Sequence, residues 1–182
     1  MSLTIRVVGV GDAFTGRYHN ACLLVESAGT RLLIDAPPAL ARALRDLGTQ
    51  GGERVSLSEI DHVLITHLHG DHMGGLEQLL YYRRFVTGKK LNLYAMKEVL
   101  AGLWETRLRG GMETLLLGDG SRQTLGLCDY AEVTPLQAGG LDLADLRVHF
   151  RPTLHHIPTS ALRIESQGRC VGYSADTAFD PS

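Results

Sequence analysis

The sequence predicts an α/β protein in which β-sheets form a sandwich covered by helices. Segments of alternating, β-branched character lie near both ends of the chain, where short turns connect them as antiparallel hairpins. Between these ends, segments with apolar residues at helical spacing alternate with short apolar strands. A mixed order of this kind is typical of layered α/β architectures.

The first half of the chain is expected to contain four strands and one helix: strands at residues 3–9, 21–26, 30–35 and 62–66, and a helix from Pro38 to about Leu47. The second and third strands flank Ser27-Ala28-Gly29, which predicts a hairpin turn. Pro38 suits the first turn of a helix, because the N–H that proline lacks has no partner there. Gly48 then predicts the end of this helix.

In the second half, a helix is expected to begin near Gly74 and to direct Leu76, Leu79, Leu80 and Phe85 inward. Residues 110–145 are rich in glycine and give no clear pattern. The other expected elements are a strand at 91–94, a helix at 95–109, and strands at 146–153, 160–166 and 169–174.

Composition limits the class of protein. A chain of 182 residues predicts a single domain, residues 1–182, and no apolar run approaches the ~20 residues that cross a bilayer. The N-terminus lacks the pattern of a secretory leader, and three distant cysteines argue against a disulfide framework, so we expect a cytoplasmic protein. Residues 81–110 carry seven Lys and Arg against two Glu, either as a solvated helical face or as a cationic rim near a substrate. The cysteines read as small core residues.

The segment from Thr66 to Gly75, Thr-His-Leu-His-Gly-Asp-His-Met-Gly-Gly, follows an apolar strand directly. His67 and His69, two residues apart on an extended stretch, point to the same side and can share one metal ion. After the turn at Gly70, Asp71 and His72 can face a second ion. Imidazole and carboxylate donors suit Zn first, with Mn or Fe as alternatives. A histidine-rich surface turn would not explain three histidines and an aspartate within six residues.

The pattern His-x-His-x-Asp-His after an apolar strand resembles the second motif of the metallo-β-lactamase fold superfamily. Asp35, which closes Leu32-Leu33-Ile34-Asp35, is similar to the structural aspartate of the first motif; it also suits the N-cap of the helix at Pro38. The segment from His155 to Glu165 resembles the third motif of the tRNase Z branch. In that register His155 is the third ligand of the first site and His156 lies behind the ligands or on the substrate side, whereas a slip of one residue would exchange them.

Tyr173-Ser174-Ala175-Asp176-Thr177 resembles the fourth motif, Tyr-Ser-Gly-Asp-Thr, with Ala175 in place of glycine. The resemblance implies that Asp176 bridges two ions. It also implies a four-layer αββα sandwich. The late histidine of the fifth motif is absent, so either the sequence is a fragment lacking a C-terminal strand–helix segment or the second site is weak and open. Apolar surface left exposed by such a missing segment would favour a homodimer. The implied ligands are His67, His69, Asp71, His72, His155 and Asp176.

The fold alone does not fix the reaction. The branch that the third and fourth motifs resemble includes tRNase Z and cyclic-phosphate hydrolases. We therefore expect a dinuclear phosphodiesterase, with Asp71 as general base and no identifiable general acid. Only 20 residues separate His155 from Asp176, too few for the tRNA-gripping arm of tRNase Z, so a small or short nucleotide-like substrate is favoured over tRNA 3′-end processing or another long nucleic acid. The alternatives are hydrolysis of ester, thioester or lactone bonds, as in glyoxalase II or lactonases, and a non-catalytic scaffold. No membrane partner is expected.

Overall fold

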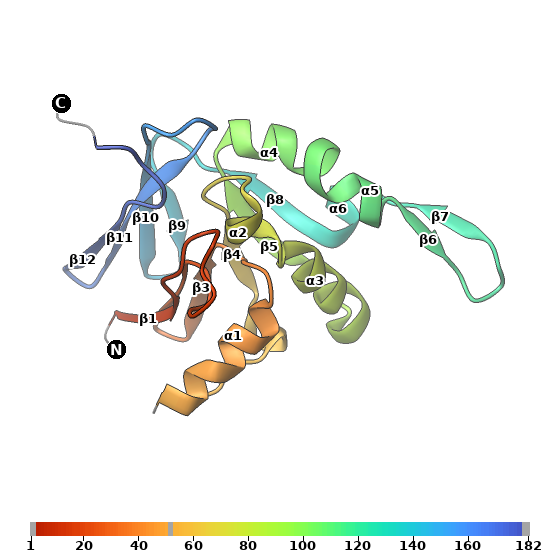
Figure 1. Cartoon of the computed structure of the whole chain (residues 1–182), viewed down its shortest axis with the longest axis horizontal. Coiled ribbons are helices and arrows are strands. Elements are labelled where there is room, and N and C mark those ends of the chain that lie inside the picture. Colours follow the sequence, from red (N-terminus) through yellow and green to blue (C-terminus); the bar gives the residue numbers. More distant parts are fainter. Residues whose placement is uncertain (1–2, 51–52, 180–182) are drawn as a thin grey trace.

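Two β-sheets form the centre of the molecule in the computed structural model, which describes residues 3–50 and 53–179 (Figure 1). The six-stranded sheet has the order β1 (Thr4–Gly9), β2 (Cys22–Ser27), β3 (Thr30–Ile34), β4 (His62–Leu64), β5 (Leu91–Ala95) and β8 (Ala131–Pro135). The four-stranded sheet has the order β12 (Arg169–Tyr173), β11 (Ser160–Ser166), β10 (Leu146–Pro152) and β9 (Leu141–Leu143). Buried residues of both sheets belong to one hydrophobic core, which confirms the predicted sandwich.

Helical segments connect the strands of the six-stranded sheet and bury their apolar sides against the core. They are α1 (Leu40–Asp46), η1 (Leu47–Gln50), η2 (Leu57–Glu59), α2 (Gly70–Met73), α3 (Leu76–Tyr81), η3 (Tyr82–Thr87), α4 (Lys97–Leu103), η4 (Trp104–Leu108), α5 (Arg109–Met112) and α6 (Leu127–Tyr130). A hairpin of β6 (Thr114–Leu116) and β7 (Arg122–Thr124) protrudes from the body of the molecule (Figure 1). In the described chain, every helical segment therefore precedes the strands of the second sheet.

The strands predicted from periodicity are present, but two helical predictions are wrong in detail. The first helix begins at Leu40 rather than Pro38, because Ala39 adopts a left-handed conformation (φ 58°) that cannot continue a right-handed helix. Asp35 consequently does not cap this helix, whose N-cap residue is Ala39. Phe85 is 55% exposed rather than buried, because the π-helical turns of η3 break the periodicity that the prediction assumed.

Parallel pairing brings the motif-bearing loops together. Strands β3, β4, β5 and β8 run parallel, so the residues after each strand meet at one edge of the sheet. Asp35 follows β3, and the histidine motif follows β4. The two loops pack tightly, since a Cβ on Gly75 would lie 2.2 Å from the carbonyl oxygen of Pro37. Glycine at position 75 therefore permits the close approach that holds the histidine motif against the segment after β3.

Several surface predictions have mixed outcomes. Among the basic residues of 81–110, Arg83 is buried and binds Asp61 and the carbonyl oxygen of Ser58, whereas most of the others are solvated. Cys22 is a core residue as expected, but Cys128 and Cys170 are exposed, which corrects the expectation that all three pack in the core. Among the described residues, no helix has both the length and the apolar character needed to span a membrane.

Candidate metal centre

Four predicted ligands lie together where the two sheets meet. Donor atoms of His67, His69, His155 and Asp176 all lie within 4.8 Å of one another. The loop after β4 supplies the first two, the loop between β10 and β11 supplies the third, and the segment after β12 supplies the aspartate. Residues more than 100 positions apart thus converge, and the backbone N–H of Ser160 at the start of β11 donates to the carbonyl oxygen of Thr66 after β4, which joins the two sheets at this point.

The spacing of these donors fits a single divalent ion. The Nδ1 atom of His69 lies 3.0 Å from Nε2 of His67 and 3.2 Å from Nε2 of His155. Oδ2 of Asp176 lies 3.8 Å and 3.9 Å from the Nε2 atoms of His67 and His155. Donors around a tetrahedral zinc ion are separated by about 3.4 Å, given zinc–nitrogen bonds of about 2.0–2.1 Å. The chemistry and spacing of this donor set therefore suit a divalent metal.

A second group of donors faces the other oxygen of Asp176. Oδ1 of Asp176 lies 3.3 Å from Nε2 of His72, which in turn lies 3.6 Å from Oδ2 of Asp71. Asp176 thus presents one carboxylate oxygen to each group of donors. This arrangement is compatible with the predicted bridging role, and it brings all six predicted ligands into one basin.

Buried hydrogen bonds fix which nitrogen of each imidazole faces the basin. Asp35 is fully buried and accepts hydrogen bonds from the backbone N–H of Thr66 (2.8 Å) and from its hydroxyl group. Nδ1 of His72 donates to Oδ2 of Asp35 at 2.8 Å, which leaves Nε2 free as a donor to a metal. Because the Thr66 hydroxyl donates its one proton to Asp35, it accepts from Nδ1 of His67, 3.0 Å away, and leaves Nε2 of that ring free. Asp35 and Thr66 therefore orient two rings from behind.

Electrostatics keep the deepest ring neutral. Burial lowers the pKa of His67 to about 3, and the neighbouring rings of His72 and His69 act in the same direction. Burial likewise contributes most to the lowered pKa of His69. A neutral imidazole is the form that binds metal, so these rings need not lose a proton first. Burial raises the pKa of Asp35, although the contacts from His72 and Thr66 oppose that rise.

The histidines that are not predicted ligands lie outside the group of four donors. His156 is exposed and its ring centroid lies 4.6 Å from that of His69, outside the group of four donors. This position agrees with the predicted register, in which His155 faces the ligands. His19 binds Asp46 and His62 binds the hydroxyl of Tyr94, so both rings have partners outside the metal basin. His149 lies on the polar side of β10, within 4.0 Å of Glu165.

Two threonines assist the site without a role in the sequence prediction. Thr66 orients Asp35 and His67, as described above. Thr153 donates its hydroxyl proton to the backbone carbonyl of Asp176 at 2.8 Å, and so ties the segment after β12 to the end of β10. The sequence offered one indication of the role of Thr66, namely its position between the strand and the first histidine of the motif. Thr153 had none, because its partner is a backbone atom 23 residues away.

Ala175 adopts a left-handed conformation, with φ at 48°. Glycine at this position, as in the motif that the segment resembles, would adopt the same conformation without a clash of Cβ. We expect Ala175→Gly to raise the free energy of unfolding by roughly 0.5–1 kcal/mol, measured by urea denaturation. Ala161→Gly, in the extended strand β11, is the control and should lower it. An unchanged or reduced stability of Ala175→Gly would show that the backbone there is not strained.

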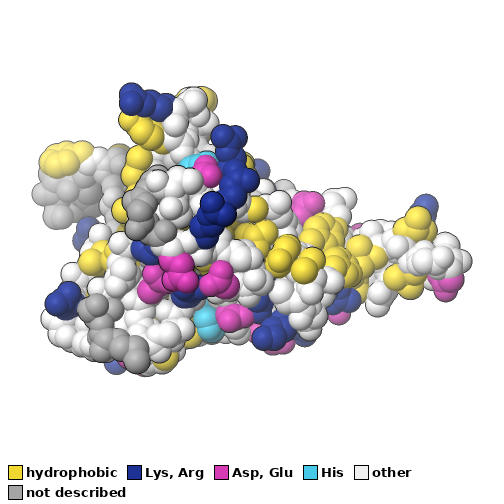
Figure 2. Space-filling model, turned by 90° about the horizontal axis from the view of Figure 1, so that it is seen from below, with side chains coloured by type: hydrophobic (Ala, Val, Ile, Leu, Met, Phe, Trp, Pro, Cys, Tyr) yellow, Lys and Arg dark blue, Asp and Glu magenta, His cyan; other side chains and the backbone are white. Residues whose placement is uncertain are grey.

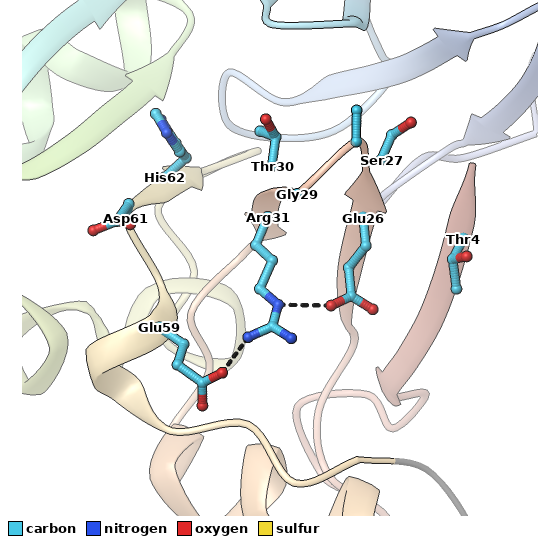
Figure 3. A pocket seen from close by; sticks show the side chains of 10 residues that line it. Thr4, Glu26, Ser27, Gly29, Thr30, Arg31, Glu59, Asp61 and His62 are labelled. Atoms are coloured by element: carbon cyan, nitrogen blue, oxygen red, sulfur yellow. Dashed lines mark hydrogen bonds and ion pairs between the residues drawn. The ribbon is translucent and has the colours of Figure 1, made fainter. Parts of the chain in front are cut away.

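A hollow at the opposite edge of the six-stranded sheet has a different character (Figure 3). It encloses about 420 Å³ between the starts of β3 and β4. Arg31 crosses it and binds both Glu26 and Glu59, so its charges are paired within the chain. Acidic side chains gather on the face seen from below (Figure 2). Among the residues that the structure describes, those lining this hollow do not belong to the group of metal donors.

Comparison with known proteins agrees with this geometry. The profile of the family "Anti-Pycsar protein Apyc1" matches residues 3–182. The anti-Pycsar protein Apyc1 of Bacillus phage 010DV004 is 35% identical over 190 residues, which cover 98% of this chain and 70% of the relative. The metallo-β-lactamase fold protein YhfI from Bacillus subtilis superposes with a TM-score of 0.72 at 20% identity, covering 97% of this chain. Human tRNase Z, short form, superposes with a TM-score of 0.64 at 18% identity, covering 94% of this chain and 68% of that chain.

The two packed sheets, with a His/Asp cluster at the ends of their strands, define a protein of the metallo-β-lactamase fold that carries a donor set suited to a divalent metal ion. This confirms the resemblance drawn from the four motifs. Within this class, the chain belongs to the family of the anti-Pycsar protein Apyc1. It spans 63% of the length of YhfI and about 70% of the phage relative.

Proposed function

We propose that this protein is a metal-dependent phosphodiesterase that hydrolyses a small, nucleotide-like phosphodiester. The observation that carries the proposal is Asp176, whose two carboxylate oxygens face two separate groups of donors. Two ions held in this way, with zinc the expected metal, would supply an activated water and a charge clamp on the attacking and leaving oxygens of an in-line displacement. The same donor set also suits Mn or Fe.

The side chains of this basin have three proposed roles: binding of the ions, general-base catalysis and orientation of the histidine rings. His67, His69 and His155 would hold the first ion, and Asp71, His72 and Asp176 would hold the second. Asp71 is the proposed general base, because its carboxylate lies beside His72 and remains 14% exposed to the basin. Asp35 and Thr66 keep the rings in register and exclude water behind them.

The loops around the basin support a small substrate. Strands β11 and β12 occupy the interval between His155 and Asp176, which leaves no room there for a long tRNA-gripping arm. The hollow that contains Asp176 encloses about 650 Å³, a volume typical of small-molecule sites. The relatives are named anti-Pycsar proteins rather than tRNA-processing enzymes. A cyclic or short linear nucleotide therefore fits the site better than a folded RNA.

Turnover of matched substrates tests the proposed reaction. We expect the metal-loaded protein to hydrolyse bis-p-nitrophenyl phosphate and a 3′,5′-cyclic mononucleotide much faster than p-nitrophenyl acetate, a thioester or a lactone. The His156→Ala and His149→Ala variants are assayed beside the wild type as a matched pair. His156 lines the hollow that contains Asp176, whereas His149 does not. Preferred turnover of the thioester or lactone would assign the site to the carbonyl-hydrolase alternative instead. No turnover at all in the metal-loaded protein would favour a scaffold.

We also propose a second copy of the chain as a partner. Phe85, Val86 and Leu116 are 55%, 64% and 73% exposed. Hydrophobic side chains gather on the face that leads toward the β6–β7 hairpin (Figure 2). A patch of this kind favours association in water. Sedimentation of the wild type should give a dimer and Val86→Asp a monomer, whereas a monomeric wild type would contradict the proposal.

A further inference from the structure

A second hollow adjoins the metal basin on the far side of His155 and His156. It encloses about 530 Å³, and both histidines line it as well as the hollow that contains Asp176. Its other walls come from the start of α4, the end of β8 and the loop between β10 and β11, which lie close together at the top of Figure 1. The two hollows are therefore neighbouring compartments separated by one dipeptide.

The walls of this hollow differ from those of the basin. Met96 and Leu136 are buried at its floor, and Phe150 and Pro158 add apolar surface at its sides. The exposed ring of His156 stands between the two compartments, 4.3 Å from the ring of His155 between centroids. Lys97 and Glu98 line the pocket as exposed side chains of opposite charge. The apolar side chains together with the two flat rings of Phe150 and His156 suit a planar heteroaromatic group.

We propose that this compartment, which we call the Phe150 pocket, binds the nucleobase of the substrate while the phosphodiester lies in the metal basin. The proposal rests on the proposed phosphodiesterase function and names the part of the substrate that the chain recognises. Any planar base can stack on an aromatic ring, so the pocket favours nucleotides over simple phosphodiesters without strong preference among bases.

Equilibrium binding tests the pocket separately from catalysis. Thymidine 5′-monophosphate and inorganic phosphate are titrated calorimetrically into the metal-loaded protein. We expect the wild type to bind the nucleotide about 5- to 150-fold more tightly than phosphate, since stacking of a base contributes about 1–3 kcal/mol. The variants Phe150→Leu and His156→Ala should each lose most of this difference and keep the affinity for phosphate. Phe150→Leu changes shape while preserving an apolar side chain, so it should fold.

Two control variants make the same kinds of substitution at residues that lie outside the pocket. Phe85→Leu alters an exposed phenylalanine in η3, and His149→Ala removes a histidine on β10 that does not line this pocket. Both should bind the nucleotide as the wild type does. Equal affinity of the wild type for nucleotide and phosphate, or an unchanged preference in both pocket variants, would overturn the proposal. Loss of phosphate binding in His156→Ala would assign that ring to the metal basin, and Phe150→Leu would then decide alone. Absence of phosphodiester turnover with an intact nucleotide preference would reject the proposed reaction and leave the pocket standing.

Discussion

Replacement of Asp176 by asparagine is expected to reduce phosphodiester turnover by at least ~10²-fold. The two carboxylate oxygens of Asp176 face different groups of donors, at 3.8 Å from Nε2 of His67 and 3.3 Å from Nε2 of His72. An asparagine side chain keeps only one oxygen acceptor and carries no charge, so it cannot serve both groups. Steady-state kinetics with bis-p-nitrophenyl phosphate, together with metal content by mass spectrometry, would measure the effect.

Asp142→Asn is the matched control for this change, because Asp142 is an exposed residue of β9 whose contact is an ion pair with Arg147. It should leave turnover and metal content unaltered. If Asp176→Asn retained turnover within tenfold of the wild type and the same number of bound ions, the bridging role would be wrong.

Replacement of Asp35 by asparagine should lower metal affinity by about 10–100-fold, although Asp35 lies behind the metal basin. Its carboxylate accepts the Nδ1–H of His72 and so leaves Nε2 of that ring free. An asparagine amide can place its N–H₂ group against His72 and favour the other tautomer, in which Nε2 is protonated and cannot bind metal. The substitution also keeps the size of the side chain, and asparagine tolerates the positive φ of 64° at this position.

Metal titration and urea denaturation measure this prediction together. We expect a fall of about 1–3 kcal/mol in the free energy of unfolding of the metal-free protein, because a fully buried network loses an acceptor. Asp119→Asn, in the turn of the β6–β7 hairpin, serves as the control since its partners are local. Wild-type metal affinity in Asp35→Asn would show that the His72 tautomer is set by another group.

Local sequence patterns were sufficient to predict most strands and to group the candidate metal ligands by motif. Alternation predicted β1, and the turn signal at Ser27-Ala28-Gly29 between two apolar segments predicted β2 and β3. The spacing of His67 and His69 on an extended segment predicted a shared ion, and their donor atoms lie 3.0 Å apart. These features depend on neighbours in sequence, which is why they could be read from the chain alone.

Features that depend on tertiary contacts could not be predicted. The π-helical turns of η3 and η4 change helical periodicity without a signal in composition, and so Phe85 is exposed. Strand β8 pairs with β5 at the edge of the six-stranded sheet, although its sequence lies within a region without clear periodicity. The resemblance implied a structural role for Asp35, but its contacts with Thr66 and His72 depend on the meeting of the loops after β3 and β4 and could not be read from its own neighbours.

Restoration of activity by added metal tests the central claim most directly. The protein is stripped of metal, reloaded with increasing equivalents of Zn or Mn, and assayed with bis-p-nitrophenyl phosphate, with His67→Ala in parallel. We predict no turnover without metal, recovery that saturates near two equivalents, and no recovery in His67→Ala, because this buried ring faces both His69 and Asp176. Turnover by the metal-free protein, or full recovery of His67→Ala, would contradict the assignment of this basin as a metal-dependent phosphodiesterase site.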